Sequence, residues 1–180
     1  GFGGSCFPKD IQAFAALSNN KGLPMKTIEA AISANDHQKT RMTEKMKSLM
    51  GGDFAGKQIA VLGLAFKPNT DDVRESSSIT MIRTIFDHGG HVRAYDPIAN
   101  DSMKEIFPEL NCFESWELAC KDADGVVIMT EWNEFRGMSL EVLKSLVSTP
   151  VILDTRNILS IEKLNEYGFI FDNVGRKPVL

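Results

Sequence analysis

Residues 57–66 read KQIAVLGLAF, an apolar run that starts directly after the turn-rich stretch GGDFAG at 51–56. An apolar run of this length, bounded by turn residues, is typical of a strand that is covered on both faces. After a charged loop, residues 76–90 read SSSITMIRTIFDHGG, which predicts an amphipathic helix capped by serines at one end and by glycines at the other. A buried strand followed by a helix indicates a parallel α/β sheet.

The rest of this half of the chain repeats the alternation of strand and helix. Further apolar stretches predict strands at 91–97, 124–130, 150–155 and 168–174. Helical spacing recurs around 101–107, 115–121, 139–146 and 161–167. Strands separated by helices imply right-handed crossovers. The expected fold class is therefore α/β, a Rossmann-like parallel sheet with flanking helices, preceded by a helical segment with one long helix.

The first part of the chain predicts helices rather than strands. Pro8 suits the first turn of a helix. Over residues 24–50, apolar side chains recur at helical spacing, and at roughly 1.5 Å per residue this helix would be about 40 Å long. A helix of that length usually bridges domains or subunits. We therefore expect two parts, a helical region at 1–53 and a Rossmann-like domain at 54–180.

Composition and charge exclude several classes of function. The 180 residues are 43% hydrophobic and 24% charged, as in an ordinary globular protein. The net charge is -4, and basic residues are scattered among the acids, which argues against a nucleic-acid surface. No run approaches the roughly 20 apolar residues that span a bilayer. The cysteines Cys6, Cys112 and Cys120 form no zinc or disulfide set. We therefore expect a cytoplasmic protein with no metal, nucleic-acid or membrane partner.

Residues 1–10, GFGGSCFPKD, place a thiol just before a helix. Cys6 lies upstream of Pro8, near a helix N-terminus, where unpaired N–H groups and the helix dipole favour the thiolate. Lys9 and Asp10 fall in the first turn, where a cation can hold an oxyanion and a carboxylate can take a proton from water. The alternative is a buried structural cysteine beside a capping aspartate, which the flanking glycines and charges disfavour.

A charged loop follows the strand at 57–66 and carries two basic residues. In open α/β sheets, ligands bind beyond the carboxyl ends of the strands, where Lys67 and Arg74 fall. Lys67 can serve as a point charge for a phosphate or a sugar hydroxyl, and Arg74 as a fork for a second phosphate. Alternatively, both residues only neutralise the acids of a solvated turn, Asp71, Asp72 and Glu75.

Polar residues also follow the other predicted strands. Arg156 could reach a ligand from the end of its strand, or it could form a salt bridge with Asp154. Asp96 ends a strand where ribose-binding acids often sit, but no segment carries the G-x-G-x-x-G pattern that a dinucleotide site needs. Trp132 can pack over the edge of the site or in the core. We therefore expect a Rossmann-like sheet without the dinucleotide fingerprint.

Four segments, in this order, are similar to segments of the UDP-glucose/GDP-mannose dehydrogenase family. Residues 1–10 resemble the catalytic cysteine segment of that family, and GLAFKPNTDDVRESSS at 63–78 resembles the signature of its C-terminal nucleotide-sugar-binding domain. DADGVVIMTEWNEF at 122–135 and LDTRN at 153–157 match two further segments. The resemblance covers essentially the whole chain, which is thereby identified as a member of the family without its N-terminal NAD-binding domain.

The residues around the thiol are most similar to family members that oxidise UDP-glucose. Members that act on GDP-mannose tend to have leucine after the cysteine, and those that act on N-acetylated UDP-sugars tend to have histidine before it, whereas Ser5 and Phe7 flank Cys6 here. The resemblance implies a two-step oxidation of UDP-glucose to UDP-glucuronate with two NAD, in polysaccharide biosynthesis. Cys6 would carry a thiohemiacetal and then a thioester, Lys9 would stabilise an oxyanion or the substrate, and Asp10 would assist water.

The resemblance also implies ligand contacts. The substrate would meet Phe2, Gly3, Gly4, Phe66, Lys67 and Arg156. Arg74 would reach NAD across a cleft, and the main NAD-binding domain would lie outside this chain, which starts without methionine. The helix at 24–50 would form the core of a homodimer, as in the family, or alternatively pack within one chain.

Two alternatives concern the function itself. Without the domain that binds NAD, we expect the 180 residues alone to be inactive. They would then act as a nucleotide-sugar-binding and dimerisation module. The second alternative is the equivalent part of a family member that oxidises GDP-mannose. An unrelated NAD-binding Rossmann domain is disfavoured, because the glycine fingerprint is missing.

Overall fold

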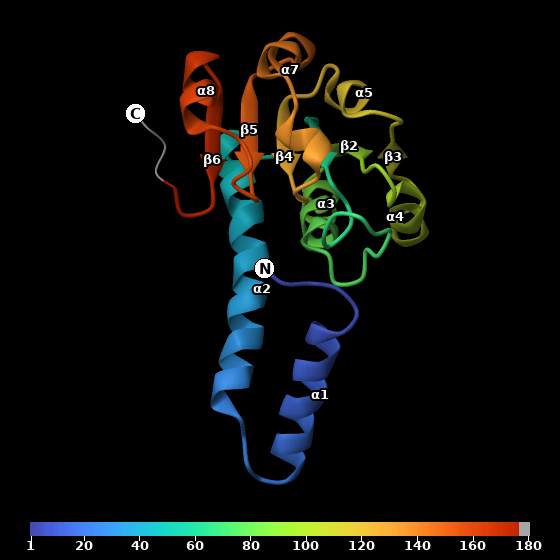
Figure 1. Ribbon diagram of the computed structural model, residues 1–180, viewed down its shortest axis with the longest axis vertical. Coiled ribbons are helices and arrows are strands. Elements are labelled where there is room, and N and C mark those ends of the chain that lie inside the picture. Colours follow the sequence, from blue (N-terminus) through green and yellow to red (C-terminus); the bar gives the residue numbers. More distant parts are fainter. Residues whose placement is uncertain (177–180) are drawn as a thin grey trace.

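Six parallel strands form the sheet of the larger part of the molecule (Figure 1). The computed structural model describes residues 1–176. The strands are β1 (Gln58–Leu62), β2 (His91–Tyr95), β3 (Asn111–Cys112), β4 (Gly125–Ile128), β5 (Val151–Asp154) and β6 (Ile170–Asn173). Their spatial order is β3-β2-β1-β4-β5-β6, so the chain adds strands on one side of β1 up to β3 and on the other side from β4. This is the strand order of a Rossmann sheet, and the predicted α/β class is confirmed.

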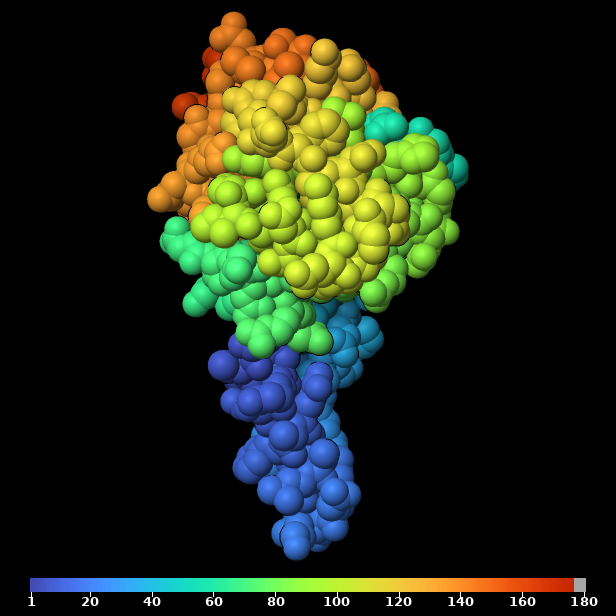
Figure 2. Space-filling model, turned by 90° about the vertical axis from the view of Figure 1, so that its right-hand side faces the viewer, coloured from blue at the N-terminus to red at the C-terminus, as the bar shows by residue number. Residues whose placement is uncertain are grey.

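Two helices at the start of the chain form a hairpin that projects from the sheet (Figures 1 and 2). α1 spans Phe7–Asn20 and α2 spans Lys26–Leu49. The 24 residues of α2 make a helix of about 36 Å, at roughly 1.5 Å per residue. Its last turns are buried on the sheet through Met42 and Met46, while its first half extends away from the sheet beside α1. The single long helix expected at 24–50 is confirmed.

The remaining helices and the end of α2 cover the two faces of the sheet. They are α3 (Ser77–Asp87), α4 (Asn100–Ile106), α5 (Trp116–Cys120), α6 (Asn133–Arg136), α7 (Leu140–Leu146) and α8 (Ile161–Glu166). Side chains of a strand alternate between faces. Ile59 and Val61 of β1 pack with α2, α3 and α4, whereas Ala60 and Leu62 pack with α5, α6, α7 and α8. Both faces are therefore apolar, which is why the strands read as continuous apolar runs.

The end of β1 differs from the sequence-based expectation. The apolar run continues to residue 66, but the strand ends at Leu62 because the chain turns at Gly63, whose φ is +90°. A Cβ on Gly63 would lie 2.6 Å from the backbone nitrogen of Thr130, so only glycine allows the chain to pass so close. The loop that follows is thereby directed to the carboxyl edge of the sheet.

Two elements were not expected from the sequence, β3 and α6. β3 has two residues and pairs only through Arg93 with Asn111 and Ala94 with Cys112. α6 has four residues. Segments this short contain too few positions for a periodic pattern to appear.

Residues 1–176 contain neither a membrane-spanning helix nor a cluster of metal-binding side chains. No helix there is both long and apolar enough to cross a membrane. No group of three or more histidine, cysteine, aspartate or glutamate residues there could hold a metal ion.

Candidate functional site

The carboxyl edge of the sheet brings together three parts of the chain that are far apart in sequence. The segment after β1, the segment after β5 and the start of the chain meet there, and α2 passes beside them. A small cavity of about 80 Å³ is lined by residues of all these parts, among them Gly1, Lys39, Ser77 and Arg156. This is the edge at which open α/β sheets bind their ligands.

Gly1 to Cys6, which we call the cysteine segment, have no regular secondary structure and lead to the start of α1 at Phe7. Two neighbours hold its backbone. The amide of Phe2 donates to Asn35 Oδ1 at 2.7 Å, and the amide of Gly4 donates to the carbonyl of Arg74 at 2.9 Å. Gly4 has a φ of +88° and lies so close to Phe66 that a Cβ would be 2.8 Å from the phenyl ring. The glycines thus serve close packing against the loop after β1.

Cys6 is exposed at the N-terminal end of α1, as the sequence predicts. Its carbonyl accepts the hydrogen bond of the Asp10 amide at 2.9 Å, which starts the helix. The thiol lies 3.7 Å from the Ser5 hydroxyl. The alternative of a buried structural cysteine is therefore wrong. Cys6 is the N-cap residue of α1, at the positive end of the helix dipole, although its side chain makes no capping hydrogen bond.

Lys9 and Asp10 lie in the first turn of α1, also as the sequence predicts. Their side chains are exposed and pair with each other, with Lys9 Nζ at 3.4 Å from Asp10 Oδ1. Lys9, Ser5 and Arg74 line one cavity of about 410 Å³ beside the cysteine segment. Asp10 is not among the residues that line it. The structure thus brings Lys9 and Arg74 to one cavity beside the cysteine segment and leaves Asp10 outside it.

Arg74 is tied to an acid of its own loop. Its Nε and Nη2 donate to the two carboxylate oxygens of Asp72, at 2.9 and 2.8 Å. This hydrogen-bonded fork lowers the pKa of Asp72 and raises the pKa of Arg74. In this structure Arg74 therefore pairs with an acid of its own turn, which is the alternative that the sequence left open. A contact between Arg74 and another ligand would require the fork to open.

Phe66 and Lys67 lie side by side on the same loop. Lys67 is exposed, and its Nζ lies over the ring of Phe66, 5.3 Å from the centroid. Phe66 is half-buried and also contacts Gly4. Lys67 therefore presents its charge to solvent at the rim of the site, where an anion could meet it.

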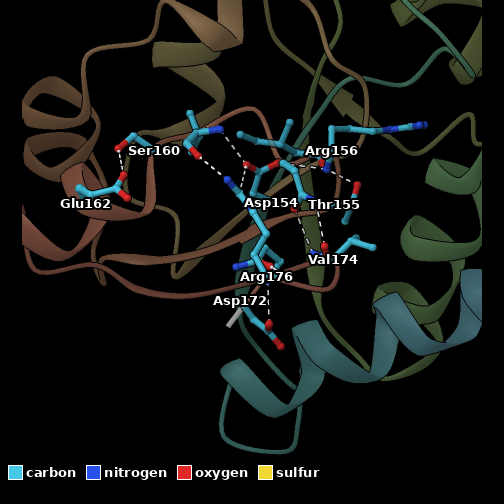
Figure 3. A network of polar contacts seen from close by, with 12 residues as sticks. Asp154, Thr155, Arg156, Ser160, Glu162, Asp172, Val174 and Arg176 are labelled. Atoms are coloured by element: carbon cyan, nitrogen blue, oxygen red, sulfur yellow. Dashed lines mark hydrogen bonds and ion pairs between the residues drawn. The ribbon is translucent and has the colours of Figure 1, made fainter. Parts of the chain in front are cut away.

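Arg156 follows β5 and turns toward β4 rather than toward Asp154 (Figure 3). Its Nε donates to the carbonyl of Met129 at 2.6 Å and lies 3.3 Å from Glu131 Oε2. The second contact is an ion pair by distance but lacks hydrogen-bond geometry, since Glu131 Oε2 is buried without a hydrogen-bond partner. Among residues 1–176, only Nε of the Arg156 guanidinium makes a hydrogen bond or ion pair. The two terminal nitrogens can receive a ligand.

Asp154 has a structural role that the sequence did not reveal. Its side chain is buried, and it accepts hydrogen bonds from the backbone amides of Arg156 and Leu159 at 3.0 and 2.9 Å. Its ionic partner is Arg176, at 3.4 Å. The alternative of a salt bridge between Arg156 and Asp154 is therefore wrong, because the backbone and not the guanidinium of Arg156 meets the carboxylate (Figure 3).

Asp96 is likewise structural, although it ends β2 at the ligand edge. It is 1% exposed and accepts five hydrogen bonds. The donors are the amides of Leu64, Ala65, Ile98 and Ala99 and the indole nitrogen of Trp132. Its lone pairs are thus used within the chain, and Trp132 belongs to the core. Asp96 holds the start of the loop that carries Phe66 and Lys67.

Sequence reasoning missed two residues of α2 that contact this site. Asn35 bonds the backbone of Phe2, and Lys39, one turn later, lies 3.3 Å from the carboxylate of Glu75. In the sequence both belong to the polar face of a long helix. Most residues just before Asn35 are small, which would allow another segment to pack closely on α2. That pattern does not show that the segment is the one around Phe2, 33 residues earlier.

Two family models match the chain. The UDP binding domain of the UDP-glucose/GDP-mannose dehydrogenase family matches residues 60–161. The central domain of the same family matches residues 1–37.

Similar proteins cover nearly all of the chain. A UDP-glucose 6-dehydrogenase of Rhizobium meliloti is 40% identical over 176 residues, which are 98% of this chain and 40% of that protein. The UDP-glucose 6-dehydrogenase TuaD of Bacillus subtilis is 41% identical over 180 residues, with coverages of 99% and 39%. The chain thus spans about two fifths of the length of these relatives.

Solved structures agree with these matches. A UDP-glucose dehydrogenase from Pyrobaculum islandicum superposes with a TM-score of 0.83 at 31% identity, over 96% of this chain and 37% of that one. A UDP-D-ManNAc dehydrogenase from Pyrococcus horikoshii gives a TM-score of 0.81 at 29% identity, over 99% and 40%.

Proposed function

Because the chain belongs to the UDP-glucose/GDP-mannose dehydrogenase family, we propose that it works as the C-terminal part of an NAD-dependent UDP-glucose 6-dehydrogenase. The names of the relatives at about 40% identity support UDP-glucose as the substrate. The observation that carries the proposal is the exposed thiol of Cys6 at the start of α1, on a segment bonded to the loop after β1. Residues 1–53 would be the end of the helical region and 54–180 the UDP-sugar-binding domain.

The nucleophile, a cation and a base for the thiol chemistry would come from this chain, whereas the hydride acceptor would be held mainly by another part of the protein. The Cys6 thiolate adds to the carbonyl carbon of the aldehyde formed in the first oxidation, and the carbonyl oxygen takes a proton. Lys9 would stabilise that oxygen while it is negative. Loss of a hydride and a proton from this thiohemiacetal leaves a thioester. Asp10 then takes a proton from water, which attacks the thioester; the carbon–sulfur bond breaks, and the carboxylate and the thiolate are released.

NAD would accept the hydride in both oxidations. The described residues do not form the usual cradle for it, because the turn after β1 has one glycine, Gly63, packed against Thr130, where a dinucleotide fold leaves room for a pyrophosphate. NAD would therefore be held mainly by another part of the protein, with Arg74 reaching it after release from Asp72. The 180-residue chain by itself would then bind the nucleotide sugar without oxidising it.

The substrate would lie between the cysteine segment and the carboxyl edge of the sheet. The two unused nitrogens of Arg156 and the exposed ammonium of Lys67 would meet the diphosphate or the sugar hydroxyls. Phe66 would pack on the nucleotide, and the backbone of Phe2, Gly3 and Gly4 would border the sugar. A cytoplasmic location stays a prediction, which the three free cysteines favour.

A homodimer through the hairpin is part of the proposal. Five large apolar side chains of the hairpin are exposed: Phe7 at 55%, Phe14 at 50%, Leu17 at 55%, Leu23 at 73% and Met25 at 37%. Exposed apolar side chains gathered on one projecting element are typical of an interface between subunits.

The test replaces Cys6 in the complete gene product that contains residues 1–180. With UDP-glucose and NAD, the unaltered protein should form NADH and UDP-glucuronate, whereas Cys6→Ser should form no acid, because an alkoxide is a far poorer trap and leaving group than a thiolate. Cys112→Ser, at a residue with no role in the site, should retain activity. Acid formation by Cys6→Ser at the original rate would overturn the assignment.

Substrate binding is tested separately, by calorimetric titration of the 180-residue chain. We expect heat on addition of UDP-glucose and none with GDP-mannose. Tighter binding of GDP-mannose would support the alternative substrate. Binding of NAD without binding of UDP-glucose would contradict the proposal that this chain holds the nucleotide sugar and another part of the protein holds NAD.

A further inference from the structure

Asn35 is a buried polar residue in the middle of α2. It is 8% exposed and, with Thr43, one of two buried polar residues of this helix. Asparagine is a poor helix former, because its side chain competes with the backbone for hydrogen bonds. A buried asparagine in the middle of a helix therefore needs partners outside that helix.

Both ends of the Asn35 amide bond to one residue, Phe2. Asn35 Oδ1 accepts from the backbone nitrogen of Phe2 at 2.7 Å, and Asn35 Nδ2 donates to the backbone oxygen of Phe2 at 3.1 Å. Phe2 belongs to no helix or strand, so this side chain supplies the partners that a neighbouring strand would otherwise supply. An amide offers a donor and an acceptor side by side, which a carboxylate and an aliphatic side chain do not.

The contact is close on both sides of Phe2. A Cβ on Gly1 would lie 2.4 Å from Asn35 Oδ1, and a Cβ on Gly3 would lie 2.4 Å from the carbonyl oxygen of Glu75. Glu75 in turn pairs with Lys39, one turn after Asn35 on α2. The cysteine segment is thus clamped between α2 and the loop before α3, with no room for larger residues.

Phe2 is also linked to the residue that follows the thiol. The rings of Phe2 and Phe7 pack edge to face, with centroids 4.8 Å apart. Phe7 is the first residue of α1 and follows Cys6 directly. Cys6 lies between Phe2 and Phe7 in the sequence, so holding Phe2 restrains the backbone on both sides of the sulfur.

We propose that Asn35 is a positioning residue, which sets the place of the Cys6 sulfur by holding the backbone of Phe2. The effect of Asn35 on the reaction rate rests on the proposed function, in which Cys6 is the nucleophile. A reacting atom misplaced by about 1 Å can lose about 100-fold in rate. Lys67 and Arg156 lie on the loops after β1 and β5 and not on the cysteine segment, so their side chains would stay at the site without Asn35. Only the backbone contacts of residues 2–4 with the sugar would be loosened.

Two substitutions in the complete gene product test this. Asn35→Ala removes both bonds to Phe2 and leaves a better helix former in α2. Asn35→Asp keeps the shape and the acceptor but loses the donor. We expect kcat for UDP-glucose oxidation to fall about 10- to 100-fold in Asn35→Ala and less in Asn35→Asp, with a smaller rise in KM from the loosened backbone contacts of residues 2–4. Asn35→Gln, which keeps the amide, should recover part of kcat.

The matched control is Thr43→Val. It removes the other buried polar group of α2, whose hydroxyl bonds only to the Thr40 carbonyl of the same helix, at 2.7 Å. If Asn35 acted only by stabilising α2, Thr43→Val at equal loss of melting temperature would lower kcat as much as Asn35→Ala. That result, or an unchanged kcat in Asn35→Ala, would overturn the proposal.

Two further measurements need no substrate. The amide of Phe2 should exchange its hydrogen faster in Asn35→Ala than in Thr43→Val, and the rate at which iodoacetamide alkylates Cys6 at one fixed pH should change in Asn35→Ala alone. If the folded gene product does not oxidise UDP-glucose, the proposed function fails, but the role of Asn35 can still be tested by these two measurements. An unchanged exchange rate together with an unchanged alkylation rate would refute it.

Discussion

The three cysteines of this chain differ in whether their thiols are accessible for chemistry or buried in the fold. Cys6 is exposed, whereas Cys112 is half-buried and Cys120 is buried. Burial raises the pKa of Cys112 to about 11 and that of Cys120 to about 12. Because the thiolate is the nucleophile, only Cys6 combines access with a helix N-terminus.

This difference predicts a selective alkylation. At pH 8, about a thousandth of Cys112 would be thiolate, given its pKa of about 11, and still less of Cys120. Brief treatment with iodoacetamide should therefore modify Cys6 alone, as peptide mass spectrometry would show. Modification of all three cysteines at similar rates would contradict the burial described here, and unfolding in urea, which should make the rates similar, is the control.

Asp96 predicts a large loss of stability. Asp96→Asn would place an NH2 group against backbone and indole N–H donors in a buried site, which should lower the free energy of unfolding by about 3 kcal/mol or more. Asp101→Asn makes the same change on the surface of α4 and should stay within about 0.5 kcal/mol. Urea unfolding of both variants measures the difference, and equal losses would argue against the buried role of Asp96.

At the scale of elements, the carboxyl ends of β1, β4 and β5 form the site through turns rather than through the strands themselves. Gly63 is the clearest case, since β1 ends there and the loop passes against Thr130. The turn after β5 is built in another way, around the buried carboxylate of Asp154. The direction of each loop therefore depends on a few backbone contacts at its first residues.

Gly63→Ala should be far more harmful than a similar change elsewhere. Gly52 has a comparable φ of +94°, but a Cβ there meets nothing within 4 Å. Gly52→Ala should therefore cost only the strain of a left-handed residue, about 1 to 2 kcal/mol. Gly63→Ala should add about 1 to 3 kcal/mol for the collision with Thr130. Thermal and urea unfolding compare the two, and similar values would show that backbone strain alone decides.

The elements were largely predictable from the sequence, whereas their contacts at the site were not. Strand and helix alternation from residue 57 onward predicts the sheet because the apolar runs of the central strands β1, β4 and β5 are buried on both faces. The place of Cys6 before α1 could be read from Pro8. Periodicity tells which face of a helix is polar but not what that face meets, so the contact of Asn35 with Phe2 could not be predicted from the sequence. In the same way the sequence left open whether Arg156 reaches a ligand or pairs with Asp154, and it did not reveal that the turn directs the guanidinium to the carbonyl of Met129.

The whole molecule consists of a sheet domain and a projecting hairpin that share α2 (Figures 1 and 2). The end of α2 is buried in the core of the sheet domain, and α1 carries the thiol at its start. A subunit interface on the hairpin would therefore be formed by the same helix that carries Cys6 at its start. The other helix of the hairpin, α2, would connect that interface to the core of the sheet domain.

The dimer proposal predicts a change of mass. Leu17→Glu puts a charge on the exposed apolar face of the hairpin, and Leu118→Glu makes the same change on α5, at a leucine that is 48% exposed. Sedimentation equilibrium should give a dimer for the unaltered chain and for Leu118→Glu, and a monomer for Leu17→Glu. A monomer in all three cases would remove the proposal for this chain.

The cysteine segment and the residues that hold it are widely separated along the chain. Phe66, Arg74 and Glu75 are made some 60 to 70 residues after Cys6. At a synthesis rate of about 5–20 residues per second, roughly 3 to 14 s pass between them. During that time the thiol exists without the contacts that fix its position. Because Cys6 is exposed in the folded chain as well, its sulfur depends on the reducing power of its surroundings, and not on the fold, both during and after synthesis.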